Sequence, residues 1–440
     1  MDKHYEQFKN PDSIYRPAPF WIWNEEMDSK ETCRQLQEMK EHGFGGGFAH
    51  VRLGLISPYL GEEFFKCWEE TLEYCKEHDI KLYMYDENGW PSGSAGGQVK
   101  EIYPDAVAKT LKYRRADINE VKRVKSYLFK CYAYDEATNT IGKDVTDFSV
   151  EEIGATSDKF IIVLNSVGTM EDLTNPKTVE TFIKITHDEY YRRTGKDFGT
   201  VVPAVFSDES YVSGIQPDMM LYTPTVCNKF YEMHGYRLED NYLAVFENFN
   251  GNFDKAPEKV RYDYCCTLGE LWIESFIKPI TKWCDEHGIA WTGHDQEHSW
   301  PLTKGGAYSE QRTYEFRHWP GMDWLLCEGV KNDDAWNDTL LMDEIRSAAN
   351  QFNKEKTMVE AYGAAGWQSR FRDYKRIGDW LLVHGLNFFV HHLTHYSIIG
   401  SRKRDCPQSF DWREPWWDEQ RFCSYVLAFR YSVRSLRCAS

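Results

Sequence analysis

The stretch VPAVFSDES, residues 202–210, carries the strongest indication of the fold. It is a short apolar run that stops at two adjacent carboxylates, Asp208 and Glu209. Two further runs end in the same way: IAWTGHDQEH contains Asp295 and Glu297, and TMVEAYG contains Glu360. An α/β enzyme with parallel strands presents its catalytic acids at the carboxyl ends of those strands. The three runs therefore predict acid/base chemistry on a neutral, polar substrate.

Eight strand-like runs alternate with helical patterns along the chain. The runs cover residues 19–24, 46–52, 81–86, 202–208, 289–294, 323–328, 357–361 and 386–392. Eight strands that alternate with helices predict the α/β class and a (β/α)8 TIM barrel. An open, doubly wound sheet is the alternative. The glycine-rich GFGGG at 43–47 does not support it, because it lacks the strand-before, helix-after context of a phosphate-binding loop.

One segment interrupts this alternation. Between residues 104 and 170, the runs AVAKTLKYRR, VKSYLFKCYAYD and KFIIVLNSV predict strands joined by polar turns. We expect a small β-rich insertion after the third strand. Residues 1–103 and 171–440 would then form the barrel, and residues 104–170 the insertion. The abrupt ending SVRSLRCAS predicts that the chain is part of a longer protein.

Charge and composition exclude several classes of partner. The net charge of −17 argues against nucleic acid, because proteins that bind it carry basic patches. No run is apolar and long enough for a membrane span, and the N-terminal MDKHYEQFKNPDS lacks the apolar core of a signal peptide. The 12 cysteines include no CxxC pair, which is typical of reduced thiols. These features predict a cytoplasmic protein without a membrane partner.

Aromatic residues make up 15% of the chain. A large core is the simplest explanation. The other explanation is a cleft lined with aromatic rings, since the C–H faces of pyranose sugars pack on such rings. The sequence leaves both open.

Glu209 and Glu360 are the leading candidates for catalysis. Glu209 lies beside Asp208, and repulsion between adjacent carboxylates raises one pKa, which makes that carboxyl group available to protonate a leaving oxygen. Glu360 ends an otherwise apolar strand, where an acid is costly unless it faces a wet cleft or a partner. A helix cap or surface acid is the alternative for Glu209, and a buried ion pair is the alternative for Glu360.

The string GHDQEHSW gathers His294, Asp295, Glu297 and His298 within five residues. Histidine and carboxylates are common metal ligands, so the string could hold a metal ion. It could equally form a hydrogen-bonding rim for sugar hydroxyls, or be an ordinary polar loop. Three histidines near the last strand support zinc only weakly, because neighbouring side chains of a strand point to opposite faces; they are His391, His392 and His395.

Four other residues are candidates for contact with substrate. His50 and Arg52 share one face of the second strand and could bind hydroxyls or form an ion-paired core face. Asp86 ends the third strand, and Trp90 follows it in YDENGWPSGSAGG, residues 85–97. The glycines of this string suit a loop whose backbone approaches a ligand closely. A tight structural turn is the alternative.

Three strings together resemble glycoside hydrolase family 106, an α-L-rhamnosidase group. They are PFWIWNEEMD, RQLQEMKEHGFGGGFAHVRLGL and YDENGWPSGSAGGQV, and the resemblance runs from about residue 15 to about residue 412. It implies a (β/α)8 barrel with appended β-sandwich domains, which are not expected within these 440 residues. It also implies an inverting glycosidase for α-L-rhamnosides or related deoxy-sugar glycosides.

The resemblance also implies roles for individual residues. By position, it carries the general acid to Glu209 and the general base to Glu360, with Glu297 as a competing base. It implies a calcium ion near the substrate hydroxyls, no organic cofactor, and an oligosaccharide or glycoside substrate. The residues expected to line the sugar site are His50, Arg52, Asp86, Trp90, Asp208, His294, Asp295 and Glu297.

Two other functions compete with glycoside hydrolysis. A non-catalytic carbohydrate-binding barrel, or an inactive remnant of a longer glycosidase, would bind a sugar without turnover. A zinc hydrolase of amide bonds would carry an HxH pair at the end of its first strand. The first run here reads FWIWNEE and contains no histidine.

Overall fold

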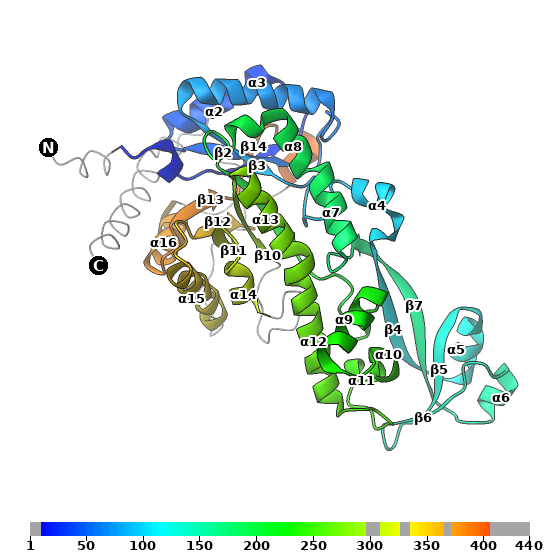
Figure 1. Ribbon diagram of the computed structural model, residues 1–440. Coiled ribbons are helices and arrows are strands. Elements are labelled where there is room, and N and C mark those ends of the chain that lie inside the picture. Colours follow the sequence, from blue (N-terminus) through cyan, green and yellow to red (C-terminus); the bar gives the residue numbers. More distant parts are fainter. Residues whose placement is uncertain (1–9, 296–308, 326–334, 365–370, 405–440) are drawn as a thin grey trace.

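A computed structural model gives the fold and describes residues 10–295, 309–325, 335–364 and 371–404. Its main sheet is a parallel barrel (Figure 1). In chain order, the barrel strands are β1 (Phe20–Trp23), β2 (Gly46–Val51), β3 (Lys81–Tyr85), β8 (Ala204–Ser210), β10 (Ala290–Asp295), β11 (Trp319–Leu325), β12 (Met358–Gly363), β13 (Phe388–His391) and β14 (Thr394–His395). From β1 to β13 each strand pairs with the next in this order, and β14 pairs with β1, so the predicted barrel is confirmed.

The eighth position of the barrel is shared by two short strands. β13 pairs with β12, and β14 pairs with β1, both in parallel. The short stretch between them therefore closes the ring. The predicted sixth strand, 323–328, is displaced: β11 begins four residues earlier, at Trp319, and residues 326–328 lie outside the described part of the chain. The prediction followed the apolar run and overlooked Pro320 and Gly321, which are compatible with the start of a strand.

Helices cover the outside of the barrel, and three of them lie apart from it, beside α12 and the second sheet (Figure 1). Those around the barrel are α2 (Ser29–Glu41), α3 (Glu62–His78), α4 (Gln98–Ile102), α7 (Pro176–Ile185), α8 (His187–Thr194), α12 (Pro257–Trp272), α13 (Lys278–His287), α14 (Glu310–Tyr314), α15 (Ala335–Gln351) and α16 (Phe371–Val383), and the three that lie apart are α9 (Pro224–His234), α10 (Leu238–Asn241) and α11 (Leu243–Phe246). A π-helical turn, 273–277, joins α12 to α13. Short 3-10 turns cover 13–15, 104–106, 125–127, 195–197 and 400–404. Within the described residues, no helix is long and apolar enough to cross a membrane.

Alternation along the strands separates two apolar cores. Phe20 and Ile22 of β1 point into the barrel and pack with inward residues of the other strands, such as Phe206 of β8. Trp21 and Trp23 point outward and are buried under the helices. Many of the aromatic residues are therefore core residues, which is the simpler of the two explanations that the composition allowed. The filled interior leaves only the ends of the strands for a binding site.

A second, antiparallel sheet projects from the barrel (Figure 1). Its strands are β4 (Val107–Ala116), β5 (Leu128–Asp135), β6 (Thr140–Asp144), β7 (Phe160–Glu171) and β9 (Met219–Leu221), in the order β6-β5-β7-β4-β9. One face packs on α5 (Ile118–Val124) and α6 (Val150–Gly154), and the other packs on residues of α11 and its neighbours. Four of the five strands lie in or at the edge of the segment 104–170, and β9 joins them from beyond the fourth barrel strand. The division of the chain at 103 and 171 stays a prediction.

Candidate active site

Three polar side chains meet at the ends of three barrel strands. Asp208 lies on β8, His294 on β10 and Glu360 on β12, and each is at most 3% exposed. His294 Nε2 lies 2.8 Å from Glu360 Oε2 and 3.6 Å from Asp208 Oδ1. One imidazole thus bridges two carboxylates that are far apart in the sequence. The structure brings together three of the residues that the sequence predicted for the site.

Burial and charge act against each other in this cluster. Burial alone lowers the pKa of His294, but the hydrogen bond to Glu360 and the charges of Asp208 and Glu360 raise it well above its usual value. Burial raises the pKa of Glu360, although the hydrogen bond from His294 acts in the opposite direction. The arrangement favours an imidazolium paired with a carboxylate.

The same cluster has the composition of a metal site. One ligand atom from each of Asp208, His294 and Glu360 lies within 4.8 Å of the other two. Nitrogen and carboxylate oxygen ligands of this kind bind several divalent ions. The three residues could hold a metal ion, and the geometry does not distinguish between ions.

Tyr85 contacts the far side of Asp208. Its hydroxyl lies 2.6 Å from Asp208 Oδ2 and 2.7 Å from the carbonyl oxygen of Gly89. Burial raises the pKa of Tyr85 well above its usual value, so it stays a hydrogen-bond donor. The sequence analysis did not identify Tyr85, although Tyr85 directly precedes the predicted site residue Asp86.

Glu209 occupies a bulge at the end of β8. Ser207 pairs with Gly293 and Ser210 with Asp295, so β8 has one more residue here than β10. Glu209 has a φ of +40°, a left-handed conformation that is uncommon for a residue with a side chain. Its side chain is partly exposed, and its charge raises the pKa of Tyr211, after the larger effect of burial. The bulge therefore directs Glu209 differently from the buried Asp208.

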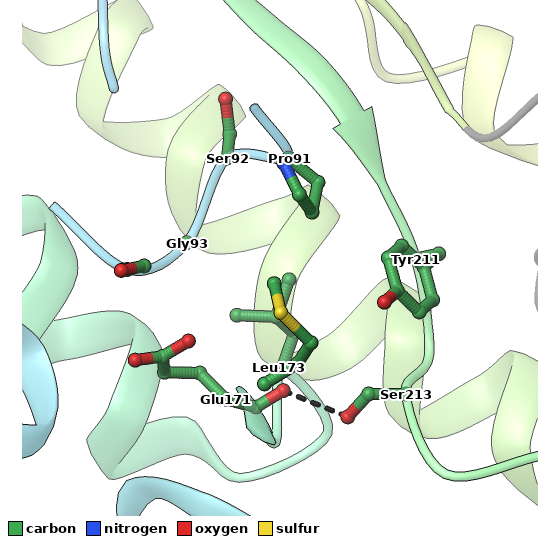
Figure 2. Close-up of a pocket in the computed structure, with 9 residues that line it drawn as sticks. Pro91, Ser92, Gly93, Glu171, Leu173, Tyr211 and Ser213 are labelled. Carbon is green, nitrogen blue, oxygen red and sulfur yellow. Dashed lines mark hydrogen bonds between the residues drawn. The ribbon is translucent and has the colours of Figure 1, made fainter. Parts of the chain in front are cut away.

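Tyr211 lines a small pocket beside this strand end (Figure 2). Its walls come from the loop after β3, the end of β7 and the segment after β8: Pro91, Ser92, Gly93, Ser94, Met170, Glu171, Leu173, Tyr211 and Ser213. Ser213 Oγ donates a hydrogen bond of 2.8 Å to the Glu171 carbonyl oxygen, drawn in Figure 2. One of its walls, Ser92, accepts a hydrogen bond from the Asp208 N–H, but none of the three cluster residues lines the pocket.

Arg52 supplies a cation at the barrel mouth. Its Nε donates to His50 Nε2 at 3.1 Å, and its guanidinium lies 4.2 Å from the ring centroid of Trp90. Trp90 is 47% exposed. Burial and then the charge of Arg52 lower the pKa of His50 well below its usual value, so His50 is neutral and accepts this hydrogen bond. The group combines an exposed ring with polar atoms, as a sugar site requires.

Asp86 directly follows β3 and is fully buried. The Ser92 hydroxyl donates to Oδ1 at 2.6 Å and the Ser207 hydroxyl donates to Oδ2 at 2.5 Å. Burial raises the pKa of Asp86 to about 8, despite these two hydrogen bonds. The raised pKa favours the neutral form of Asp86 at neutral pH. Asp86 therefore contributes to the site through its hydrogen bonds with Ser92 and Ser207, not as a charge.

Asp295 takes its partners from outside the cluster. Its carboxylate pairs with Arg317 and accepts a hydrogen bond of 3.0 Å from Thr313, and both side chains of the ion pair are fully buried. Burial raises the pKa of Asp295 to about 6. Contact between Asp295 and a substrate stays a prediction, and Glu297 lies outside the described residues.

Two further residues at the mouth were not among those predicted to line the sugar site. Asp323 of β11 lies in register with Glu360, and its charge contributes to the raised pKa of His294. His392 Nε2 lies 3.9 Å from Glu360 Oε1, whereas His391 packs against Phe44 on the other side of the strand. The expectation that these two histidines point to opposite faces is confirmed. Asp323 and His392 were recognised as site residues only from their positions relative to Glu360 on neighbouring strands, and the sequence does not show this pairing.

Comparison with solved structures supports the barrel. A rhamnosidase from Novosphingobium sp. PP1Y superposes with a TM-score of 0.69 at 14% identity, over 98% of this chain and 60% of that chain. A family 42 β-galactosidase from G. stearothermophilus gives a TM-score of 0.53 at 12% identity, over 95% of this chain and 58% of that one. An endo-1,4-β-mannanase from Rhizomucor miehei gives 0.50 at 9% identity, over 94% and 95%. At these identities the likeness shows the fold alone, and the chain spans about three fifths of the rhamnosidase.

Comparison at the level of sequence identifies the family. A search of curated proteins finds no match. The model of glycoside hydrolase family 106, described as alpha-L-rhamnosidase, matches residues 163–428, which is more than half of the chain. This match includes β8, β10 and β12, and therefore Asp208, His294 and Glu360. The chain belongs to glycoside hydrolase family 106.

Proposed function

We propose that the protein hydrolyses glycosides, and that its substrates are α-L-rhamnosides or related deoxy-sugar glycosides. One observation carries the proposal: Asp208, His294 and Glu360 converge at the end of the barrel strands in a chain of this family. A barrel mouth that combines buried carboxylates, a cation and an exposed aromatic ring suits a neutral sugar.

The proposed mechanism inverts the anomeric centre. Glu209 gives its proton to the glycosidic oxygen as the bond to the anomeric carbon breaks. Glu360 takes a proton from a water molecule while the water oxygen attacks that carbon from the opposite face. The two carboxyl groups must then lie about 6.5–9.5 Å apart, which leaves room for the water.

Neighbouring groups support these two roles. The hydrogen bond from His294 holds Glu360 at 2.8 Å and favours its ionised form, which a base needs. The partly exposed position of Glu209 is compatible with an acid that must reach the leaving group. Trp90 offers a ring to the sugar, and His50 and Arg52 offer polar atoms to its hydroxyls. Asp86, Asp208, His294, Asp295 and Glu297 complete the proposed lining.

Calcium, the ion that the resemblance implies, fits the cluster only in part. Calcium takes six to eight oxygen ligands, and Asp208 and Glu360 supply such oxygens. His294 presents a nitrogen, which suits zinc better than calcium. The proposed mechanism therefore passes no step through a metal ion. Metal analysis, with activity measured before and after a chelator, tests both ions: stoichiometric zinc would favour the amide-hydrolase alternative.

The first test is hydrolysis of a panel of aryl glycosides, with the α-L-rhamnoside included. We expect Glu360→Gln to lower kcat by orders of magnitude, because the carboxamide cannot accept the proton of water. Glu209→Gln should lower it less on an activated aryl leaving group and more on an alkyl rhamnoside, whose leaving oxygen needs the proton. Glu136→Gln, at an exposed position in the turn between β5 and β6, is the matched control.

Other outcomes separate the alternatives. A folded wild-type protein that binds rhamnose but turns over no glycoside would contradict hydrolysis and support a binding barrel. If Glu360→Gln retained full activity, the assignment of the base would be wrong.

A further inference from the structure

The loop after β3 folds around one buried carboxylate. Glu87 is 2% exposed, and it accepts hydrogen bonds from backbone N–H groups of the loop that follows it. Asn88 (2.8 Å) and Gly96 donate to Oε1, and Gly93 (3.1 Å), Ser94 (2.8 Å) and Ala95 (2.7 Å) donate to Oε2. Successive N–H groups that converge on one anion form a nest, which binds negative charge well. Here the anion belongs to the chain itself.

The backbone conformational preferences of its residues cannot by themselves hold the loop in this conformation. Gly93 has a φ of +131° and Ala95 a φ of +51°, and such conformations are rare for most residues. A glycine-rich loop also has many alternative conformations, which it loses when it orders. The shared acceptor therefore determines which conformation is populated.

The same loop reaches the end of β8. Ser92 Oγ accepts the N–H of Asp208 at 2.9 Å, and the N–H of Ser92 donates to the Asp208 carbonyl oxygen at 2.8 Å. Trp90, from the same loop, covers the guanidinium of Arg52. The position of a carboxylate of the cluster and the position of the exposed ring therefore both depend on this loop.

We infer that Glu87 is a positioning residue, whose carboxylate holds the loop of residues 88–96 so that Ser92 fixes the end of β8 and Trp90 covers Arg52. Only the kinetic part of this inference rests on the proposed glycoside hydrolysis. Among the described residues, no hydrogen bond or ion pair joins Glu87 to the Asp208–His294–Glu360 cluster, so its effect passes through the loop.

A carboxamide cannot replace this carboxylate. In Glu87→Gln, an NH2 group takes the place of one oxygen, and it is a donor. If it replaces Oε1, it faces the N–H groups of Asn88 and Gly96. If it replaces Oε2, it faces those of Gly93, Ser94 and Ala95. Either orientation leaves buried donors unsatisfied.

Amide hydrogen exchange on the full chain tests the structural part without any substrate. In Glu87→Gln we expect faster exchange at residues 93–96 and also at the Asp208 amide, which bonds to Ser92. Ser92→Ala should accelerate exchange at Asp208 alone and leave residues 93–96 protected. Asp263→Asn is the control: it changes another buried carboxylate, which lies on α12 and accepts a hydrogen bond from the Tyr236 hydroxyl, and it should leave both sets unchanged.

Steady-state kinetics on an aryl α-L-rhamnoside test the functional part. Misplacement of catalytic groups by about 1 Å costs roughly a hundredfold in rate, so we expect Glu87→Gln and Ser92→Ala to lower kcat by that order. The KM should change much less than kcat, because the groups that contact the sugar remain present. Asp263→Asn should keep the wild-type kcat, which separates positioning from a general loss of buried carboxylates.

Each result decides the inference. Unchanged exchange at residues 93–96 in Glu87→Gln, or an unchanged kcat, would overturn it. If every amide of Glu87→Gln exchanged rapidly, that variant would be unfolded and Ser92→Ala would decide: retained protection of the Asp208 amide there would overturn the link to β8. If the wild-type protein hydrolysed no glycoside, the proposed function would fail, and the exchange pattern would still decide the role of Glu87.

Discussion

Buried ionisable residues characterise the site at the scale of single side chains. Asp86 is held by two serine hydroxyls, Asp295 by Arg317, and Glu360 by His294. A charge removed from water is stable only with a partner of this kind. The protonation state of each group therefore depends on its immediate neighbours.

The pH dependence of stability should reveal Asp86. Burial raises its pKa from 3.8 to about 8, so between these values the folded protein holds a proton that the unfolded chain has released. This group's contribution to stability is full below about pH 4 and is lost as the pH rises through 8. Asp86→Asn does not titrate, so its free energy of unfolding should gain on the wild type by a few kcal/mol, in order of magnitude, from pH 4 to 8. Urea unfolding at a series of pH values measures this, and parallel curves would contradict it.

The Asp295–Arg317 pair should stabilise the fold. Asp295→Ala leaves the guanidinium of Arg317 buried without its carboxylate, which typically costs about 3–5 kcal/mol of unfolding free energy. Glu270→Ala breaks the more exposed pair with Arg312 and should cost about 1 kcal/mol or less. Denaturant unfolding of both variants tests this. If both variants lost the same small amount of unfolding free energy, the buried Asp295–Arg317 pair would not stabilise the fold more than the exposed pair does.

Among the secondary-structure elements, β8 and β10 matter most for the site, because their backbones approach each other closely. Gly293 has a φ of +128°, and a Cβ there would lie 1.9 Å from the carbonyl oxygen of Ser207. This contact precedes both the bulge at Glu209 and His294. The local geometry of both groups therefore depends on one glycine.

Gly293→Ala should disrupt this pairing. We expect a loss of more than about 3 kcal/mol in unfolding free energy, because backbone must move as well as side chain. Gly288→Ala is a matched control at the end of α13: its φ is also positive, at +68°, but nothing lies within 4 Å of the added Cβ. It should cost only about 1–2 kcal/mol. Similar losses in the two variants would show that backbone conformation, not strand contact, is decisive.

Net charge matters at the scale of the whole molecule. A charge of −17 repels anionic ligands over a distance set by salt, about 30 Å at 0.01 M and about 8 Å at 0.15 M. On the proposed function, the KM for a rhamnoside that carries a carboxylate should therefore fall as salt rises between these values. The KM for a neutral rhamnoside should stay constant and serves as the control. An anionic substrate whose KM rose with salt would indicate a local positive site that outweighs the net charge.

The barrel and its strand-end acids could be predicted from the sequence. Apolar runs and amphipathic helices are local patterns, so they identify strands such as 202–208 without any knowledge of their neighbours. Asp208 and Glu360 follow from the same patterns, since a parallel barrel gathers the ends of its strands at one face. The displaced start of β11 was missed because the prediction followed the apolar run and overlooked Pro320 and Gly321, and the division of the last strand was missed because it depends on how the ring closes.

Which acids meet, and what each one contacts, was decided only by the tertiary structure. His294 and Glu360 are 66 residues apart and touch because β10, β11 and β12 have a particular register. Asp295, which directly follows His294 in the sequence, pairs instead with Arg317. Glu87 binds backbone N–H groups, which leave no signature in the residue types around it. The sequence by itself determined the order of strands and the acids at their ends, because those depend on local periodicity. Partners across the barrel depend on register, which is set by closure of the ring and by packing of its core.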